Sequence, residues 1–184
     1  MTKTEIRKKI LSQLKEMSED QYLSLSEKIF QNLVSLSEYK NCWNLMTYVS
    51  FDKEPDTIQI IKDALGKAKT VCVPLVDWEK NSMVPVQIFS IDDIDFSSKV
   101  PQPLNQSLVN INEIELVIVP GVAFDVGCNR LGRGKGFYDR FLPHCNGLKI
   151  GLAFEFQILN ELPLSPDDVP VDFVITEARI IRRS

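Results

Sequence analysis

Two stripes of apolar residues open the chain, each with the spacing of one face of an α-helix. Over residues 2–16 the apolar positions recur three and four apart, as they do along one side of a helix. They are Ile6, Ile10, Leu14 and Met17. The second stripe begins beyond Ser18 and Gln21, whose spacing is that of a helix-starting capping box. It comprises Tyr22, Leu25, Ile29, Phe30 and Leu33. The pattern therefore predicts two helices before any strand.

Short apolar runs typical of buried strands follow. Runs at 45–50 and 70–75 enclose a helical stripe that Asp56 or Thr57 can cap and that Gly66 can end. This order predicts a β–α–β unit, and such units pair their strands in parallel. Further strands are expected at 83–90, 115–119, 149–154, 173–176 and 178–181.

Prolines mark the less regular part of the predicted sheet. Pro85 places the 83–90 strand at an edge or a bulge, because proline has no N–H for a central ladder. Residues 91–113 are polar and contain Pro101 and Pro103, so a long surface connection is expected there. The predicted fold class is α/β. We expect a single domain over 1–184, a three-layer α/β/α sandwich with a mostly parallel, Rossmann-like sheet and two N-terminal helices.

Composition fits this picture and narrows the function. Of 184 residues, 44% are hydrophobic and 25% are charged, which is enough apolar material for a core and excludes a disordered chain. The formal net charge of −4 argues against a strongly basic nucleic-acid binder. No apolar run is long enough for a membrane span, and the charged N-terminus is unlike a secretory signal. Four scattered cysteines and one histidine form no zinc set, so reduced thiols in a cytoplasmic protein are expected.

The glycines are concentrated in one stretch of the chain. All but one of the 8 glycines fall there: Gly121, Gly127, Gly132, Gly134, Gly136, Gly147 and Gly151. The stretch follows the most convincing buried strand, 115–119, and leads into a predicted short helix at 137–142. In open α/β sheets, ligands bind beyond the carboxyl ends of the strands, and glycine lets the backbone approach a ligand closely. The stretch is therefore the candidate functional site.

The chemistry around these glycines predicts a phosphate site. Three alternate glycines, at 132, 134 and 136, can turn successive amides into one concavity next to the start of a helix. Positive charge surrounds it, from Arg130, Arg133, Lys135 and Arg140. Two common motifs fail here: Arg133-Gly134 replaces the Lys-Ser/Thr of a Walker A loop, and the dinucleotide fingerprint fails on its third glycine. A surface turn is the simpler alternative, but a turn needs no basic cluster.

The segment Asn129–Asp139, preceded by Pro120–Asp125, closely resembles the signature of the 5-formyltetrahydrofolate cyclo-ligase family, also called 5,10-methenyltetrahydrofolate synthetases. The resemblance extends along essentially the whole chain. Its weaker pieces are Lys3-x-x-x-Arg7, Tyr48–Ser50 with Glu54 and Thr57, Pro101–Pro103, and Val171-Asp172. The fold that it implies, a three-layer α/β sandwich, agrees with the elements predicted above.

The resemblance implies an ATP- and Mg²⁺-dependent ligase that converts 5-formyltetrahydrofolate into 5,10-methenyltetrahydrofolate and releases ADP and phosphate. The γ-phosphoryl group would go to the formyl oxygen, nitrogen 10 of the folate would attack the iminium phosphate, and phosphate would depart. Phosphoryl transfer requires mainly positioning and charge neutralisation from a protein. The implied catalytic residues are Arg133 and Lys135.

By the same resemblance, ATP would contact the first helix and the loop. The residues are Lys3, Arg7, Arg130, Leu131, Gly132, Arg133, Gly134, Lys135, Gly136, Phe137 and Tyr138. For Lys3 and Arg7, a solvated basic helix face is the alternative interpretation. Magnesium would be held by Asp139 and Asp172, since Mg²⁺ takes one or two hard carboxylates from protein. Asp172 could instead cap a turn, and Asp125 could form an Asx-turn or bind metal.

The resemblance also implies a set of residues that bind the folate. They are Val49, Ser50, Glu54, Arg133, Gly134, Lys135, Gly136 and Phe137. Glu54 is the main candidate, because one carboxylate can accept two adjacent pterin N–H groups, although a polar loop residue is the alternative. Phe137 and Tyr138 could flank the pterin ring or belong to the core.

Two other functions stay open on the residues alone. A sugar-phosphate isomerase would use the loop without ATP, but it leaves Lys3 and Arg7 unexplained. A nucleotide- or RNA-binding regulator would use the same basic loop, but no aromatic platform recurs near it. The expected partners are small molecules, 5-formyltetrahydrofolate and ATP, with no nucleic acid and no membrane. A monomer is expected, with a homodimer as the alternative.

Overall fold

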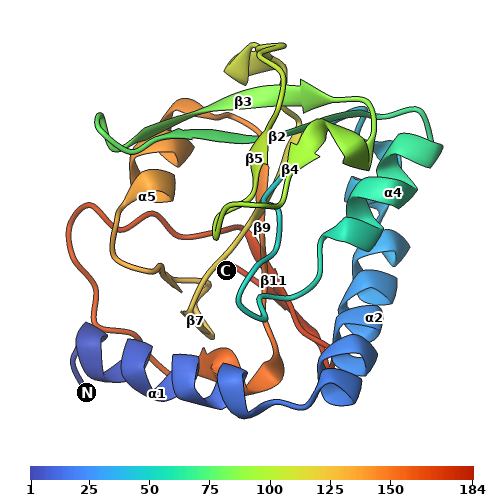
Figure 1. The fold of residues 1–184 in the computed structure, drawn as a ribbon. Coiled ribbons are helices and arrows are strands. Elements are labelled where there is room, and N and C mark those ends of the chain that lie inside the picture. Colours follow the sequence, from blue (N-terminus) through green and yellow to red (C-terminus); the bar gives the residue numbers. More distant parts are fainter.

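A computed structural model describes residues 1–184 and shows an α/β architecture built on a seven-stranded sheet (Figure 1). The strand order is β12-β11-β9-β6-β1-β2-β3. The parallel strands are β1 (Asn44–Thr47), β2 (Thr70–Asp77), β6 (Leu116–Val119), β9 (Leu148–Leu152) and β11 (Phe173–Ile175). The edge strands, β3 (Ser82–Ile88) and β12 (Ile180–Arg182), run antiparallel to their neighbours. The prediction of a mostly parallel α/β fold is confirmed, and Pro85 does lie on an edge strand.

The N-terminal helices begin at capping residues, and the predicted capping box at Ser18 is confirmed. The helices before β1 are α1 (Lys3–Glu16), α2 (Glu19–Ser35) and α3 (Ser37–Asn41). Thr2 with Glu5, and Ser18 with Gln21, each form a reciprocal capping box that satisfies free amide donors. The sequence pattern misses α3 because five residues are too few to show a periodic stripe. None of the helices combines the length and apolar character needed to cross a membrane.

The sheet separates two hydrophobic cores, because successive residues of a strand point to opposite faces. In β6, Ile118 belongs to the larger core, whereas its neighbour Val119 belongs to the smaller one. Residues of α1, α2 and α4 (Ile58–Gly66) fill the larger core. Residues of α5 (Phe137–Phe141) and η3 (Leu142–His144) fill the smaller one. In Figure 1, α2 and α4 lie on one side of the sheet and α5 on the other, which gives the three predicted layers.

Residues 91–113 are more ordered than the predicted surface connection. They contain η1 (Ile91–Asp93), β4 (Ile94–Asp95), β5 (Gln102–Pro103) and η2 (Ile111–Glu113). β4 pairs with β5, and the Gln102 side chain accepts a hydrogen bond from the Val76 backbone N–H of β2. A strand of two residues is too short to show an alternation of apolar and polar positions, so β4 and β5 cannot be predicted from the sequence pattern. The connection thereby holds Gln102 against the main sheet.

A second small sheet shapes the start of the glycine-rich loop. It consists of β7 (Ala123–Asp125), β8 (Arg130–Leu131) and β10 (Ile158–Leu159), and η4 (Glu155–Gln157) precedes β10. The buried Asp125 carboxylate accepts hydrogen bonds of 2.9 Å from the backbone N–H groups of Gly127 and Asn129. Asp125 therefore forms the turn between β7 and β8, which is the Asx-turn interpretation rather than the metal one.

β1 and β6 are neighbours in the sheet, and the chain leaves them in opposite directions. After β1 it passes through α4 to β2, whereas after β6 it passes through the glycine-rich loop and α5 to β9, on the other side. Such a reversal of strand order opens a crevice outside the carboxyl ends of the two strands. Tyr48 follows β1 and Pro120 follows β6, so both lie at this crevice.

Phe124 fills space that two glycines leave beneath the crevice. The Phe124 ring is fully buried, and a Cβ at Gly121 or Gly151 would lie 2.5 Å from it. We expect Gly151→Ala to lower the free energy of unfolding by about 1–3 kcal/mol, because a packed core must shift to admit the methyl group. Urea denaturation measures this change, and adding Phe124→Leu should recover part of it.

Gly66→Ala is the matched control for this substitution. Gly66 lies at the end of α4 with no atom within 4 Å of its added Cβ. Alanine there should leave the free energy of unfolding unchanged or raise it by up to about 1 kcal/mol. An unfolding midpoint of Gly151→Ala equal to that of the wild type would contradict the packing argument.

Candidate active site

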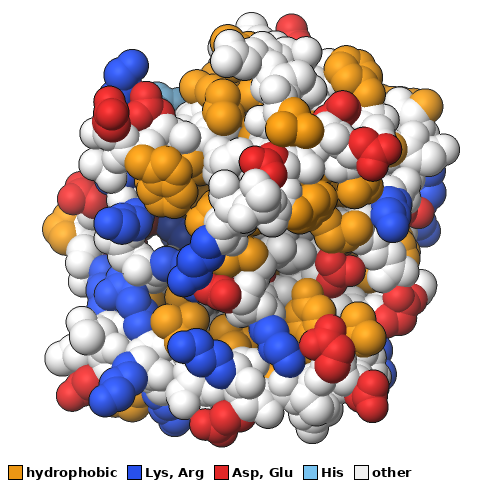
Figure 2. All heavy atoms as spheres, in the orientation of Figure 1, with side chains coloured by type: hydrophobic (Ala, Val, Ile, Leu, Met, Phe, Trp, Pro, Cys, Tyr) orange, Lys and Arg blue, Asp and Glu red, His pale blue; other side chains and the backbone are white.

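A cavity of about 170 Å³ opens where the chain segments after β1 and β6 separate. Tyr48 and Val49 line it from the end of β1, and Pro120 and Gly121 line it from the end of β6. Further lining residues include Pro74, Val76, Trp78, Met83, Val100, Gln102, Lys135 and Phe137. Figure 2 shows a hollow on this face between the positions that α5 and α1 have in Figure 1, with Lys and Arg side chains at its rim.

The glycine-rich loop forms one wall of the cavity. Gly134 and Gly136 have φ angles of 104° and 71°, a region that other residues adopt only under strain. Gly136 immediately precedes α5, which has only five residues, so its helix dipole is weak. Attraction of an anion would therefore depend on the loop amides and on the nearby basic side chains.

Arg130 supports the loop from below rather than reaching into solvent. Its side chain is only 3% exposed, and its Nη2 donates to Oδ1 of Asp139 over 2.8 Å. Its Nη1 donates to the Pro120 carbonyl, and its guanidinium lies over the Tyr138 ring, 5.7 Å from the centroid. The neighbouring Leu131 is buried in the core, so only its backbone can face a ligand. Arg130 thus connects the end of β6 to α5.

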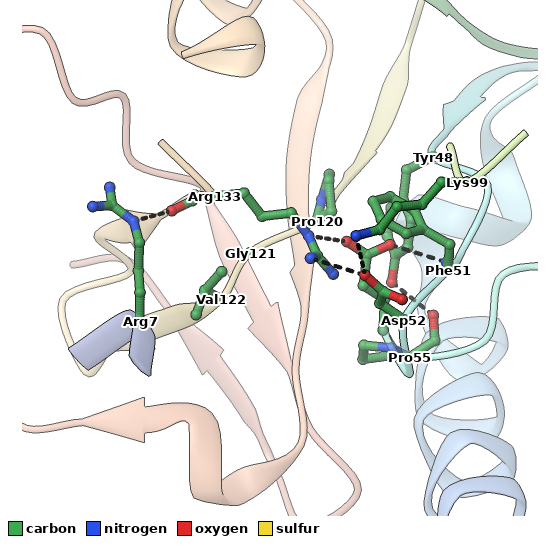
Figure 3. A network of polar contacts seen from close by, with 12 residues as sticks. Arg7, Tyr48, Phe51, Asp52, Pro55, Lys99, Pro120, Gly121, Val122 and Arg133 are labelled. Atoms are coloured by element: carbon green, nitrogen blue, oxygen red, sulfur yellow. Dashed lines mark hydrogen bonds and ion pairs between the residues drawn. The ribbon is translucent and has the colours of Figure 1, made fainter. Parts of the chain in front are cut away.

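Arg133 reaches from the loop to the segment between β1 and α4 (Figure 3). Its Nε donates to Oε1 of Glu54 at 3.2 Å, and its Nη1 lies 3.5 Å from Oδ2 of Asp52. The guanidinium also lies 4.5 Å from the centroid of the Phe51 ring. Lys99 approaches the same Asp52 carboxylate at 3.7 Å. Arg133 therefore joins the glycine-rich loop to the β1–α4 segment, which contains Glu54, through ion pairs within the site.

The first helix lies beside the glycine-rich loop. Nε of Arg7 donates to the Gly132 carbonyl at 2.8 Å, a contact drawn in Figure 3. Lys3 lies one helical turn earlier and pairs instead with Asp168, with Nζ 2.5 Å from Oδ2. Its Nζ also donates to the Ser165 hydroxyl. The structure therefore places Arg7 on the loop, whereas Lys3 is turned toward residues 165–168.

Comparison with known proteins decides the family. A sequence profile of the 5-formyltetrahydrofolate cyclo-ligase family matches residues 1–177. The chain belongs to this family. The chain is 29% identical to the 5-formyltetrahydrofolate cyclo-ligase of Mus musculus over 94% of its length and 92% of the mouse protein. It is 30% identical to the corresponding enzyme of Haemophilus influenzae over 92% of both chains.

Solved structures of 5,10-methenyltetrahydrofolate synthetases have the same fold. The one from Aquifex aeolicus superposes with a TM-score of 0.87 and 36% identity, covering 99% of this chain and 93% of that one. The one from Mycoplasma pneumoniae gives a TM-score of 0.80 and 25% identity, covering 96% of this chain and 99% of that one. The chain is thus an enzyme of the cyclo-ligase family, and its site can be compared with what the family resemblance implies.

The two carboxylates implied as metal ligands, Asp139 and Asp172, lie toward opposite ends of the parallel strands. Asp139 lines the cavity, where it also accepts the Val169 N–H at 3.2 Å. Asp172 precedes β11 and accepts the Lys149 N–H of β9, so it lies at the amino ends of these parallel strands. The cavity lies at the carboxyl ends. The structure therefore does not bring Asp172 to the cavity, and the interpretation as a turn-capping carboxylate describes its contacts.

Asp168 is the acidic residue that sequence reasoning misses. It stands next to Val169, whose N–H contacts Asp139, and it pairs with Lys3. Burial alone would raise the pKa of Asp168, but the hydrogen bond from Lys3 and the charges of Lys3 and Arg130 bring it below its ordinary value. No motif marks this position, because its neighbours come from distant segments. A cluster of three or more metal-binding side chains is absent, so a metal here would need water or substrate ligands.

Of the implied folate-binding residues, six line the cavity, whereas Ser50 and Gly134 do not. A Cβ at Gly134 would instead lie 3.6 Å from the Arg7 guanidinium. Val49, Glu54, Arg133, Lys135, Gly136 and Phe137 all line the cavity. Ser50 does not, because its hydroxyl accepts the Thr57 N–H and contacts Asp56. Ser50 therefore organises the turn between β1 and α4. Phe137 packs edge-to-face against Trp78 with a centroid separation of 5.3 Å, so it is held at the cavity wall.

Burial gives Glu54 an unusual charge state. The residue is 7% exposed, and this burial raises the pKa of Glu54 to about 7, against the attraction of Arg133. Between pH 4.5, the ordinary pKa, and about 7, the folded protein holds a proton that the unfolded chain has lost. The free energy of unfolding therefore falls as pH rises through this window.

Replacing Glu54 by glutamine should remove this pH dependence. At pH 8 we expect Glu54→Gln to be more stable than the wild type by about 1–3 kcal/mol, because no ionised carboxylate is then buried. The difference should shrink toward pH 5, as measured by urea denaturation at several pH values. Asp52→Asn serves as the control, since Asp52 contacts the same arginine but is 45% exposed. A pH-independent difference for Glu54→Gln would contradict the burial argument.

Proposed function

We propose that this enzyme converts 5-formyltetrahydrofolate and ATP into 5,10-methenyltetrahydrofolate, ADP and phosphate. The observation that supports this reaction most strongly is the shared cavity. Arg133 and Lys135 of the glycine-rich loop, which suit a triphosphate, face the same space as the buried carboxylate of Glu54, which suits a pterin. A nucleotide and a folate bound in one cavity could exchange a phosphoryl group directly.

The chemistry needs ATP because a formamide oxygen is a poor leaving group. Transfer of the γ-phosphoryl group to the formyl oxygen gives an iminium phosphate. The lone pair of folate nitrogen 10 attacks its carbon, nitrogen 10 loses its proton to water, and the C–O bond then breaks with release of phosphate. The negative charge that spreads over the phosphoryl oxygens is stabilised by the guanidinium of Arg133 and the ammonium of Lys135.

Other residues of the loop and of α1 position these two cations. Arg7 donates to the Gly132 carbonyl and so connects the first helix to the loop. Arg130 holds the loop against α5 through its bond to Asp139. Lys3 contributes indirectly, by pairing with Asp168. The backbone amides from Gly132 to Gly136, with Phe137 and Tyr138 behind them, complete the nucleotide site.

Arg133 must change partner during the reaction. In the structure it is paired with Glu54 and Asp52, the acids on the opposite segment. A triphosphate carries more negative charge and competes for the guanidinium, which leaves the Glu54 carboxylate available to the pterin N–H groups. ATP and folate should therefore assist each other's binding.

Asp139 and Asp168 fit a magnesium ion better than Asp139 with Asp172. Both are hard carboxylates near Arg130, and each has one oxygen that accepts no hydrogen bond from the protein. When bound, Mg²⁺ would neutralise charge on the phosphate oxygens of the nucleotide. Two carboxylates are the number that such a site usually takes from protein.

We also propose that residues 1–184 act as one domain and as a monomer, with a homodimer as the alternative. Both cores are built on the same sheet, and no segment forms a separate core. The proposed partners are the two small-molecule substrates, in the cytoplasm.

The reaction is tested by the absorbance of the methenyl product when 5-formyltetrahydrofolate, Mg²⁺ and ATP are supplied. Lys135→Ala should lower kcat/KM for ATP by about a hundredfold, since a cation next to the transferred phosphoryl group is lost. Lys62→Ala, an exposed lysine of α4, is the charge-matched control and should retain full activity. Folded wild-type protein that forms no product with ATP would exclude the proposed reaction.

The metal assignment is tested by titrating Mg²⁺ in the same assay. Asp168→Asn should raise the Mg²⁺ concentration for half-maximal activity about tenfold or more, because one carboxylate ligand becomes a neutral amide. Asp172→Asn should leave it unchanged, since Asp172 bonds to Lys149 at the other end of the sheet. A shift in Asp172→Asn but not in Asp168→Asn would restore the original pair.

A further inference from the structure

Gln102 carries a buried hydrogen-bond donor that the protein leaves unused. Its Oε1 accepts the Val76 backbone N–H at 2.9 Å, whereas its Nε2 is buried and has no partner. Gln102 also lines the cavity. Buried polar groups are almost always paired, so an unpaired one at a cavity wall suggests a ligand atom that completes it.

The orientation of this amide is determined by its neighbour. A carboxamide nitrogen cannot accept a hydrogen bond, so only the oxygen can face the Val76 N–H. The nitrogen must then occupy the other position of the amide. The backbone of Gln102 is held as well, since it lies between Pro101 and Pro103 and pairs with Asp95 of β4. Gln102 is therefore a donor built into the wall.

The surroundings of the donor restrict what it can bind. Pro74, Val76, Met83 and Val100 make the nearby wall apolar, which suits a flat ring rather than a phosphate. Glu54, on another segment, is the carboxylate acceptor of the same cavity. The occupant should therefore be a heteroaromatic ring with N–H donors for Glu54 and a carbonyl acceptor for Gln102.

We infer that Gln102 is a substrate-binding residue that donates a hydrogen bond from Nε2 to the ring carbonyl oxygen O4 of the pterin. This inference rests on the proposed function, which supplies the pterin. Glu54 takes the adjacent N3–H and 2-amino group, so the two side chains together bind one edge of the ring. The donor also makes Gln102 a specificity residue, because a 4-amino ring would place N–H groups against N–H groups.

The experiment compares the affinity of 5-formyltetrahydrofolate with that of its 4-amino-4-deoxy counterpart in wild type and Gln102→Met. Methionine has a similar length and no donor. The wild type should prefer the 4-oxo ligand, and Gln102→Met should reduce this preference at least tenfold while KM for ATP stays within about threefold. Comparing the two proteins cancels the effect that the 4-amino group has on Glu54.

Gln102→Glu is the second variant, because it keeps the oxygen that accepts the Val76 N–H and replaces only the donor. It should also lose at least tenfold of the preference for the 4-oxo ligand. If both variants weaken the two ligands equally, Gln102 has only a structural role and the inference is overturned. If the wild type turns over 5-formyltetrahydrofolate but the preference is unchanged in the variants, only the role of Gln102 fails. Absence of turnover in folded wild type would instead remove the proposed function.

Discussion

The candidate site depends on the buried guanidinium of Arg130. It bonds to Asp139 at the start of α5 and to the carbonyl of Pro120 at the end of β6, and it lies over the ring of Tyr138. Glycine is needed around it, because a Cβ at Gly132 would lie 2.9 Å from its Nη1. A charge with this little solvent is stable only while its hydrogen-bond partners stay in place. The positions of the glycine-rich loop, α5 and the end of β6 therefore depend on one another.

Several polar groups at the cavity are buried without adequate hydrogen-bond partners, which lowers the stability of the folded protein. Glu54 is buried at a cost that raises its pKa to about 7, although Arg133 is nearby. Gln102 Nε2 and the Tyr138 hydroxyl have no partner, and burial raises the pKa of Tyr138 above its ordinary value. Each of these groups would gain interactions from a polar ligand. Such arrangements are typical of binding sites, where stability of the free protein is reduced in favour of affinity.

Much of the framework can be predicted from local sequence. The stripes that end in Met17 and Leu33 predict α1 and α2, and the capping box at Ser18 places the start of α2. The apolar run at 115–119 becomes β6, a strand buried on both faces. Elements of two to five residues, such as α3, β4 and β5, escape prediction because they show no period. Their conformation depends on the sheet against which they lie.

The features of the candidate site likewise divide into those that are local in sequence and those that depend on tertiary structure. Glycine spacing and the flanking basic residues, taken from Arg130 to Lys135, are local properties, so the sequence by itself determines that a basic, glycine-rich loop follows a central strand and predicts that it binds an anion. Which side chains meet there is not local. Tertiary structure turns Lys3 toward Asp168, pairs Arg133 with Glu54, leaves Ser50 in a turn and places Asp172 at the far end of the sheet. The physical reason is that strand direction and crossover order decide which distant residues share an edge, and neither can be measured from the spacing of residues along the chain.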